Sequence, residues 1–205
     1  MRDRFKPKPC FAFDLDSTVT RCEILPLLAR EVGAEAEMAA RTEACMRGEA
    51  DFSADFSARV DLLRALPIAR AREIVYHVPL NEGVANFLRA HRARCFIVTG
   101  NLDVWIDALI ARLGMSGRCL SSRAAVRAGF VRGVEEALDK GAAARALPHP
   151  LVADGDGEND APMLRAAEIG VAFGGVREPG PLLRAEARYV AESEDALLTL
   201  LETYL

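Results

Sequence analysis

The segment FAFDLDSTVT, residues 11–20, constrains the fold more than any other part of the chain. An apolar run suited to a buried strand ends at Asp14 and Asp16, which are separated by one residue. Open α/β sheets form their sites at the carboxyl ends of strands. Two carboxylates this close repel each other unless a cation lies between them or one holds a proton. The sequence therefore predicts a site where the first strand of an α/β sheet ends.

A second acidic segment lies far along the chain. Residues 152–160 read VADGDGEND, so that Asp156 and its acidic neighbours also follow a short apolar run. Clustered carboxylate oxygens are the ligands that Mg²⁺ prefers. We therefore expect the two segments to meet and to form an oxygen-lined Mg²⁺ site.

Composition narrows the class of protein. With 205 residues, 51% of them hydrophobic, the chain can form one core with an insertion. A net charge of −4 argues against a nucleic-acid-binding surface, which would be basic. The five cysteines include no CxxC pair, and the charged residues 1–9 contain no apolar leader. We expect reduced thiols and a soluble, cytoplasmic protein with no membrane segment, either a monomer or a homodimer.

Strand-like runs alternate with helix-like segments over most of the chain. This alternation predicts a doubly wound, mainly parallel sheet. The expected strands are residues 10–15, 95–99, 151–153, 169–173 and 188–191. Two short alternating pieces around Ala128-Gly129, within residues 125–133, predict a hairpin at the edge of this sheet.

Residues 23–78 interrupt the alternation. Apolar residues recur there at helical spacing, with Gly33, Gly48 and Pro67 as breaks. The helices are expected over residues 24–32, 38–46, 52–66 and 69–75. We predict a small helical cap, residues 23–78, inserted after the first strand of an α/β core formed by residues 1–22 and 79–205.

Other motifs fail on spacing. A calcium loop that began at Asp14 would need Gly and Glu where Val19 and Leu25 stand, and a loop from Asp154 fails in the same way. The acids of GDGEND would repel the pyrophosphate of a dinucleotide. The chain has no Walker A sequence, no GxSxG and no HExxH.

The motifs and their order resemble those of the haloacid dehalogenase-like phosphohydrolases. The matching features are DLDST at 14–18, Thr99-Gly100 after a second strand, Lys140, and GDGEND at 155–160. The predicted cap resembles that of the phosphoserine phosphatase branch, through CE at 22–23, MRGEADF at 46–52 and RV at 59–60.

The resemblance implies an enzyme that forms an aspartyl-phosphate. Asp14 would attack phosphorus, and Asp16 would act as general acid and then as general base. Mg²⁺ would be held by the Asp14 carboxylate, the Asp16 backbone carbonyl and Asp156. Read without the resemblance, an Asp after a strand also commonly caps the next helix.

Thr99 and Lys140 would hold the phosphoryl oxygens, and Gly100 beside Thr99 would also contact the substrate. The resemblance implies that Asp160 orients Lys140 from behind and that Asn159 bonds near the nucleophile or the substrate. By itself, Lys140 is a lysine in an alanine-rich helix, where such side chains are usually solvated.

In the cap, the resemblance implies four contacts to a small zwitterionic ester. Glu23 would meet its ammonium and Arg59 its carboxylate, while Met46 and Phe52 would close over it. The plain alternatives are a surface ion pair for Glu23 and Arg59, and core packing for Met46 and Phe52.

Residues 99–101 depart from the Ser-Gly-Gly that is usual in this branch. Thr99-Gly100-Asn101 adds a methyl group at the hydroxyl and an amide where glycine permits close approach. Asn101 can therefore shrink the pocket, add a hydrogen bond or point away. The expected activity is Mg²⁺-dependent hydrolysis of phosphoserine. The alternatives are another small phosphate ester, a phosphotransferase, or a phospholigand-binding module without turnover.

Overall fold

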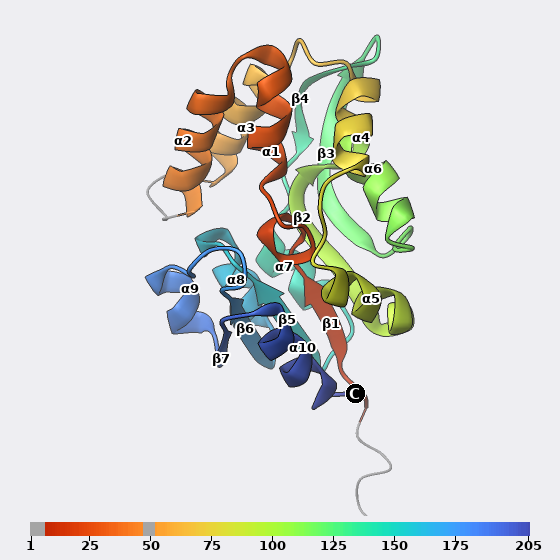
Figure 1. The fold of residues 1–205 in the computed structure, drawn as a ribbon, viewed down its shortest axis with the longest axis vertical. Coiled ribbons are helices and arrows are strands. Elements are labelled where there is room, and N and C mark those ends of the chain that lie inside the picture. Colours follow the sequence, from red (N-terminus) through yellow and green to blue (C-terminus); the bar gives the residue numbers. More distant parts are fainter. Residues whose placement is uncertain (1–6, 47–51) are drawn as a thin grey trace, which may run out of the picture.

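The computed structural model describes residues 7–46 and 52–205. They form a seven-stranded sheet in the order β4-β3-β2-β1-β5-β6-β7, in which only β4 is antiparallel to its neighbour. The strands are β1 (Cys10–Phe13), β2 (Cys95–Leu102), β3 (Cys119–Arg127), β4 (Phe130–Glu136), β5 (Leu151–Gly155), β6 (Ile169–Phe173) and β7 (Tyr189–Ala191). The predicted doubly wound, mainly parallel sheet is confirmed (Figure 1).

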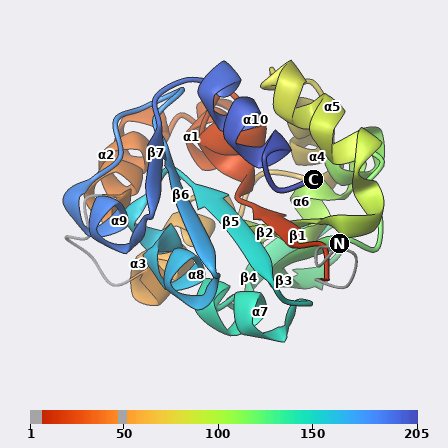
Figure 2. The same ribbon diagram turned by 90° about the horizontal axis from the view of Figure 1, so that it is seen from below.

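Helices cover both faces of the sheet, as Figure 2 shows. One face carries α5 (Glu82–Ala90), α6 (Asp103–Arg112) and α10 (Glu194–Glu202), and the other carries α7 (Lys140–Ala146), α8 (Ala161–Ala166) and α9 (Pro181–Glu186). The central strand β1 shows why both faces are needed. Phe11 and Phe13 face one layer and Ala12 the other, and all three side chains have no exposed surface.

The hairpin at the sheet edge extends further than the sequence predicted. β3 begins at Cys119 and first runs parallel to β2, and only its second half pairs with β4. Ala128 and Gly129 form the turn, with φ angles of 53° and 81°. Many side chains of β3 are half-exposed, so its sequence lacks the continuous apolar run of the inner strands.

Between β1 and α5 the regular elements of the described residues are helices, with no strand. They are α1 (Ile24–Ala29), α2 (Glu35–Met46), α3 (Phe52–Leu62) and α4 (Ile68–Tyr76). In Figure 1, α1, α2 and α3 lie beyond the carboxyl ends of the strands. α4 instead packs on α6, where Arg72 and Asp107 form an ion pair of 2.7 Å. The division into a core (residues 1–22 and 79–205) and a cap (residues 23–78) remains our proposal.

The hairpin also contacts this helical segment. The amide of Ile68, at the start of α4, donates to the carbonyl of Gly129 in the hairpin turn at 3.0 Å. Pro67 and Phe130 form a bridge beside it. Phe13 of the sheet and Phe56 of α3 also belong to one buried apolar cluster. The helical segment is therefore fixed to the sheet at its α4 end.

Candidate active site

A small cleft opens at the carboxyl ends of β1 and β2. Both the sheet and the helical segment line it. Its lining includes Asp14, Asp16, Glu23, Arg59, Thr99, Gly100, Asn101, Lys140 and Asn159, all of them predicted site residues. The side chains of Met46 and Phe52 lie outside the described part of the structure.

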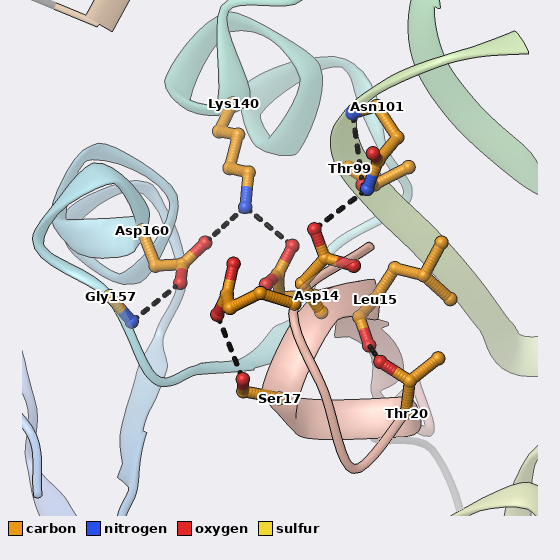
Figure 3. Close-up of polar contacts among 11 residues, drawn as sticks. Asp14, Leu15, Ser17, Thr20, Thr99, Asn101, Lys140, Gly157 and Asp160 are labelled. Atoms are coloured by element: carbon orange, nitrogen blue, oxygen red, sulfur yellow. Dashed lines mark hydrogen bonds and ion pairs between the residues drawn. The ribbon is translucent and has the colours of Figure 1, made fainter. Parts of the chain in front are cut away.

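Lys140 joins two buried acids at the base of the cleft. Its Nζ lies 2.5 Å from Asp14 Oδ1 and 2.5 Å from Asp160 Oδ1 (Figure 3). The other oxygen of Asp160 accepts from the amide of Gly157 at 3.1 Å, which fixes that carboxylate. Asp139 caps the start of α7 through the amide of Ala142, so the position of Lys140 on its helix is also fixed.

The backbone aligns the first acidic segment with the second. The amide of Asp14 donates to the carbonyl of Asp154 at 3.0 Å, which continues the pairing of β1 with β5. The chain then turns sharply over residues 15–19, where Ser17 has a φ of 53°. Such a conformation is uncommon for a residue with a side chain and is frequent at functional sites. The turn places Asp16 in the same cleft as Asp14.

Thr99 and Asn101 reach the cleft from the end of β2. The side-chain amide of Asn101 donates to Asp16 Oδ2 at 2.8 Å and to Thr99 Oγ1 at 3.2 Å. Of the three possibilities that the sequence left open for Asn101, the structure thus shows an added hydrogen bond. Figure 3 shows Asn101 and Thr99 together at this strand end, beside Asp14.

Asp156 lies behind the cleft with the properties of a metal ligand. Single carboxylate oxygens of Asp14, Asp156 and Asp160 all lie within 4.8 Å of one another. Asp156 is 1% exposed, and neither of its carboxylate oxygens has a hydrogen-bond partner among the described residues. Buried carboxylates need a compensating charge. This donor set therefore fits a divalent cation.

The protonation equilibria of these acids also indicate an excess of negative charge. Burial and the nearby Asp160 raise the pKa of Asp14 to about 7, although Lys140 opposes the shift. Burial, Glu23 and Asp14 raise the pKa of Asp16 well above its ordinary value, and they act in the same direction on Asp156. Burial lowers the pKa of Lys140, but the two acids that it contacts more than offset this effect and raise it. Lys140 therefore stays charged.

Arg59 and Glu23 face the cleft from the other side. Arg59 Nε lies 2.9 Å from Asp55 Oδ2, one helical turn earlier on α3, and both side chains are buried. Arg59 also donates to the hydroxyl of Thr42 at 3.4 Å. Glu23 accepts a hydrogen bond of 2.8 Å from the hydroxyl of Ser17. An acid and a guanidinium thus line one cleft, and each is held by a neighbour.

Sequence reasoning missed four residues that support the site. Ser17 and Asp55 hold Glu23 and Arg59, and the acid-to-arginine spacing of four residues in a helix was a usable signal for Asp55. Arg177 approaches Asp156 Oδ2 to 3.9 Å from the loop after β6. Glu158 accepts from the amides of residues 182 and 183, which ties the acidic turn to α9. Nothing local in the sequence marked these last two contacts.

Gly155 determines how closely the second acidic segment can approach Lys140. A Cβ built on Gly155 would lie 2.4 Å from Asp160 Cγ and 2.5 Å from Asp160 Oδ2. Carbon atoms do not approach one another so closely, so β5 can end against Asp160 only with glycine at this position.

Family comparison agrees with the fold and with this site. The profile of the haloacid dehalogenase-like hydrolases matches residues 11–165. The chain belongs to this family. Among the described residues, no helix is both long and apolar enough to cross a membrane.

Its curated relatives include phosphoserine phosphatases. The proteins of this name from Mycobacterium tuberculosis and Archaeoglobus fulgidus are 33% and 31% identical to it over 82% of this chain. The match covers 45% and 53% of those proteins, so the chain spans about half their length. The phosphoserine phosphatase of Halobacterium salinarum is 33% identical over 94% of this chain and 97% of its own.

Solved structures of the same kind share the fold. A phospho-aspartyl intermediate analogue of phosphoserine phosphatase superposes with a TM-score of 0.82 and 28% identity, covering 97% of this chain and 99% of that one. A substrate-bound phosphoserine phosphatase complex gives 0.80 and 27%, with the same coverage.

Proposed function

We propose that this protein is a Mg²⁺-dependent phosphoserine phosphatase that works through an aspartyl-phosphate on Asp14. The observation that carries the proposal is the position of Lys140, between Asp14 and Asp160 at the base of a cleft that Glu23 and Arg59 face. The relatives and solved structures named phosphoserine phosphatase support the same activity.

In the first step, a carboxylate oxygen of Asp14 attacks phosphorus and the bond from phosphorus to the serine oxygen breaks. Asp16 gives its proton to that leaving oxygen, because an alkoxide is a poor leaving group. The products are free serine and an acyl phosphate on Asp14. The displacement is thereby divided into two easier steps.

In the second step, a water molecule attacks the phosphorus of the acyl phosphate. Asp16, now a carboxylate, takes a proton from this water, and the bond from phosphorus to Asp14 breaks. Inorganic phosphate leaves, the Asp14 carboxylate is restored, and Asp16 is protonated again.

The remaining core residues neutralise and position charge. Lys140 and the hydroxyl of Thr99 hold phosphoryl oxygens, and Asp160 keeps Lys140 in place. Asp14, Asp156 and the Asp16 carbonyl would hold Mg²⁺, which when bound reduces the repulsion between the Asp14 carboxylate and the phosphate dianion. Gly100 and Asn159 line the same end of the cleft, where the phosphate would lie.

Recognition of serine falls to the opposite side of the cleft. Glu23 meets the ammonium group and Arg59 meets the carboxylate, in a bidentate contact that suits a planar guanidinium. We place Met46 and Phe52 over the substrate on the resemblance alone, because their side chains are not described.

The test is phosphate release from a panel of small esters with and without Mg²⁺. Phosphoethanolamine lacks the carboxylate of phosphoserine, and 3-phosphoglycerate lacks its ammonium group. We expect kcat/KM for phosphoserine to exceed that for either by about 2–4 kcal/mol, the scale of one desolvated charge-assisted contact. Equal turnover of all three would refute serine recognition and leave a general phosphatase. No turnover of any ester would leave only a binding module.

A second candidate is hydrolysis or transfer of another small phosphate ester. Asp55 favours it, because this acid already satisfies part of the guanidinium of Arg59 on which carboxylate recognition depends. Under this alternative, an ester without a carboxylate would have the highest kcat/KM in the panel.

A further inference from the structure

Asn101 is the penultimate residue of strand β2, just before α6. Its side chain is 3% exposed, so its amide lies away from bulk water. Its Nδ2 donates to Asp16 Oδ2 at 2.8 Å and to Thr99 Oγ1 at 3.2 Å. A buried amide that donates to a carboxylate makes a charge-assisted hydrogen bond, which is stronger than a neutral one.

Asn101 is itself held from two directions. Its backbone amide also donates to Thr99 Oγ1, at 3.2 Å, so one hydroxyl accepts from both nitrogens of the same residue. Because Thr99 Oγ1 already accepts two hydrogen bonds, the hydroxyl can still donate its proton to a further acceptor. The arrangement therefore fixes the rotamer of Asn101 and leaves the proton of Thr99 free to contact a phosphoryl oxygen.

The two oxygens of Asp16 differ as a result. Oδ2 accepts from Asn101, whereas Oδ1 has no hydrogen-bond partner among the residues that the structure describes. An oxygen that accepts an N–H at 2.8 Å cannot also direct a proton along that line. The hydrogen bond to Oδ2 thus favours placing the proton that Asp16 carries on Oδ1, which no described residue contacts by a hydrogen bond.

We propose that Asn101 is a positioning residue that holds Asp16 Oδ2, so that Oδ1 delivers the proton to the leaving oxygen and later takes one from water. This proposal deepens the proposed function and rests on it. Asn101 supplies a side-chain support for Asp16 that a glycine at this position could not supply.

Esters with different leaving groups provide the test. Serine needs a proton to leave, whereas p-nitrophenolate leaves without one. In Asn101→Ala, kcat/KM for phosphoserine should fall about 10- to 100-fold, a part of the roughly 10²- to 10⁴-fold that general acid–base catalysis contributes. kcat/KM for p-nitrophenyl phosphate should change less than about threefold, because this constant reports only the phosphorylation step. Asn101→Asp, which cannot donate and repels Asp16, should show a larger loss of the same kind.

A double-mutant cycle shows whether Asn101 acts through Asp16. In an Asp16→Ala background there is no carboxylate to hold, so Asn101→Ala should change the remaining turnover less than about twofold. An equally large loss in that background would overturn the proposal. So would an equal loss for both esters, or a rise in KM for phosphoserine with kcat unchanged, since that pattern belongs to a substrate contact.

Asn81 supplies the matched control. It is buried to 5% exposure, and its amide donates to the carbonyl of Thr18 in the same turn at 2.8 Å, without contacting Asp16. Asn81→Ala should lower the free energy of unfolding but leave the ratio of the two kcat/KM values unchanged. A changed ratio would mean that any loosening of the turn suffices, which would overturn a specific role for Asn101.

These outcomes separate failure of the inference from failure of the proposed function. If phosphoserine is not a substrate, the best alkyl ester of the panel takes its place, because the comparison needs only a poor leaving group. If Asp16→Ala alone slows both ester types equally, the acid–base role of Asp16 fails, and the inference fails with it.

Discussion

The two sides of the cleft both carry buried charged side chains, but they differ in how these charges are paired. On the sheet side, Lys140 contacts two acids, but the buried Asp156 has no hydrogen-bond partner among the described residues, and Arg177 approaches it only to 3.9 Å. On the helical side, Arg59 and Asp55 already form a buried ion pair before any substrate arrives. The sheet side therefore has an excess of negative charge that a bound cation would balance. On the helical side, the charge of Arg59 is already balanced by Asp55.

This difference indicates which side of the cleft determines the chemistry and which determines the choice of ester. Excess negative charge at fixed strand ends suits a cation and a phosphoryl group, which every phosphate ester supplies. Because Arg59 is already paired with Asp55, it adds binding free energy only for a substrate whose carboxylate improves on that pairing. Arg59 should therefore affect which esters are selected. Chemistry and selectivity should consequently respond to different substitutions.

The largest effect should come from the nucleophile on the sheet side. Asp14→Asn should lower kcat for every ester by at least about 10⁴-fold, because an amide oxygen is a poor nucleophile and a weaker metal ligand. Circular dichroism should show an intact fold. Turnover near that of the wild type would remove the covalent mechanism.

Removal of the metal should act on all esters as well. EDTA should abolish phosphate release and Mg²⁺ should restore it, whereas Ca²⁺ should inhibit because its larger, looser coordination shell misplaces the attacking oxygen. The measurement is phosphate release after dialysis, with metal content checked by elemental analysis. Full activity in a verified metal-free sample would contradict the proposed site.

The next effect concerns the cation that the chain itself supplies. Lys140→Met keeps the volume but removes the charge, and should lower kcat by about 10²- to 10³-fold for alkyl and aryl esters alike. A loss confined to one ester would contradict a role on the phosphoryl group. Arg145→Met, an exposed position on the same helix, is the control and should leave kcat unchanged.

Arg59 should separate the two sides most clearly. Arg59→Ala should lower kcat/KM for phosphoserine by about 2–4 kcal/mol but barely affect p-nitrophenyl phosphate, which lacks a carboxylate. This substitution also leaves Asp55 without its ion-pair partner, which should lower stability. The double variant Arg59→Ala with Asp55→Ala controls for this effect. Unchanged phosphoserine kinetics in both variants would end the phosphoserine assignment.

The smallest effect is on stability. In the metal-free protein, the pKa of Asp14 is about 7, compared with about 3.9 unfolded. At intermediate pH the folded chain therefore binds more protons than the unfolded chain. The contribution of Asp14 to the free energy of unfolding is fully present below pH about 4 and is lost as pH rises through about 7. Mg²⁺ at 100 times its dissociation constant should contribute about 2.7 kcal/mol at pH 7.5 and less at pH 5.5, where protons compete. Thermal melts with and without Mg²⁺ would show it, and an equal shift at both pH values would contradict it.

Much of this structure could be predicted from local patterns. Buried strands such as β1 and β5 are short apolar runs followed by acids, from which the parallel sheet could be predicted. The edge hairpin was predicted from the alternating pieces around Ala128-Gly129. The first half of β3 was missed because its half-exposed residues give no apolar run. The contact of α4 with α6 was also out of reach, since pairing between helices far apart in sequence leaves no local pattern.

The same distinction holds within the cleft. The sequence brought Asp14 and Lys140 into one site because the motifs of the family fix their order, and the structure places them in contact. The partner of Asn101 could not be predicted, because the sequence left open whether its side chain shrinks the pocket, adds a hydrogen bond or points away. Only the fold, which brings Asp16 and Asn101 to adjacent strand ends, distinguishes these possibilities.

Gly155 has a consequence for how this chain tolerates mutation. It carries no chemical group, yet a single added methyl would displace Asp160, and with it Lys140 from Asp14. Gly155→Ala should therefore lower kcat, although the added methyl group touches no reacting atom. The residues on which the proposed catalysis depends extend beyond those that contact the substrate.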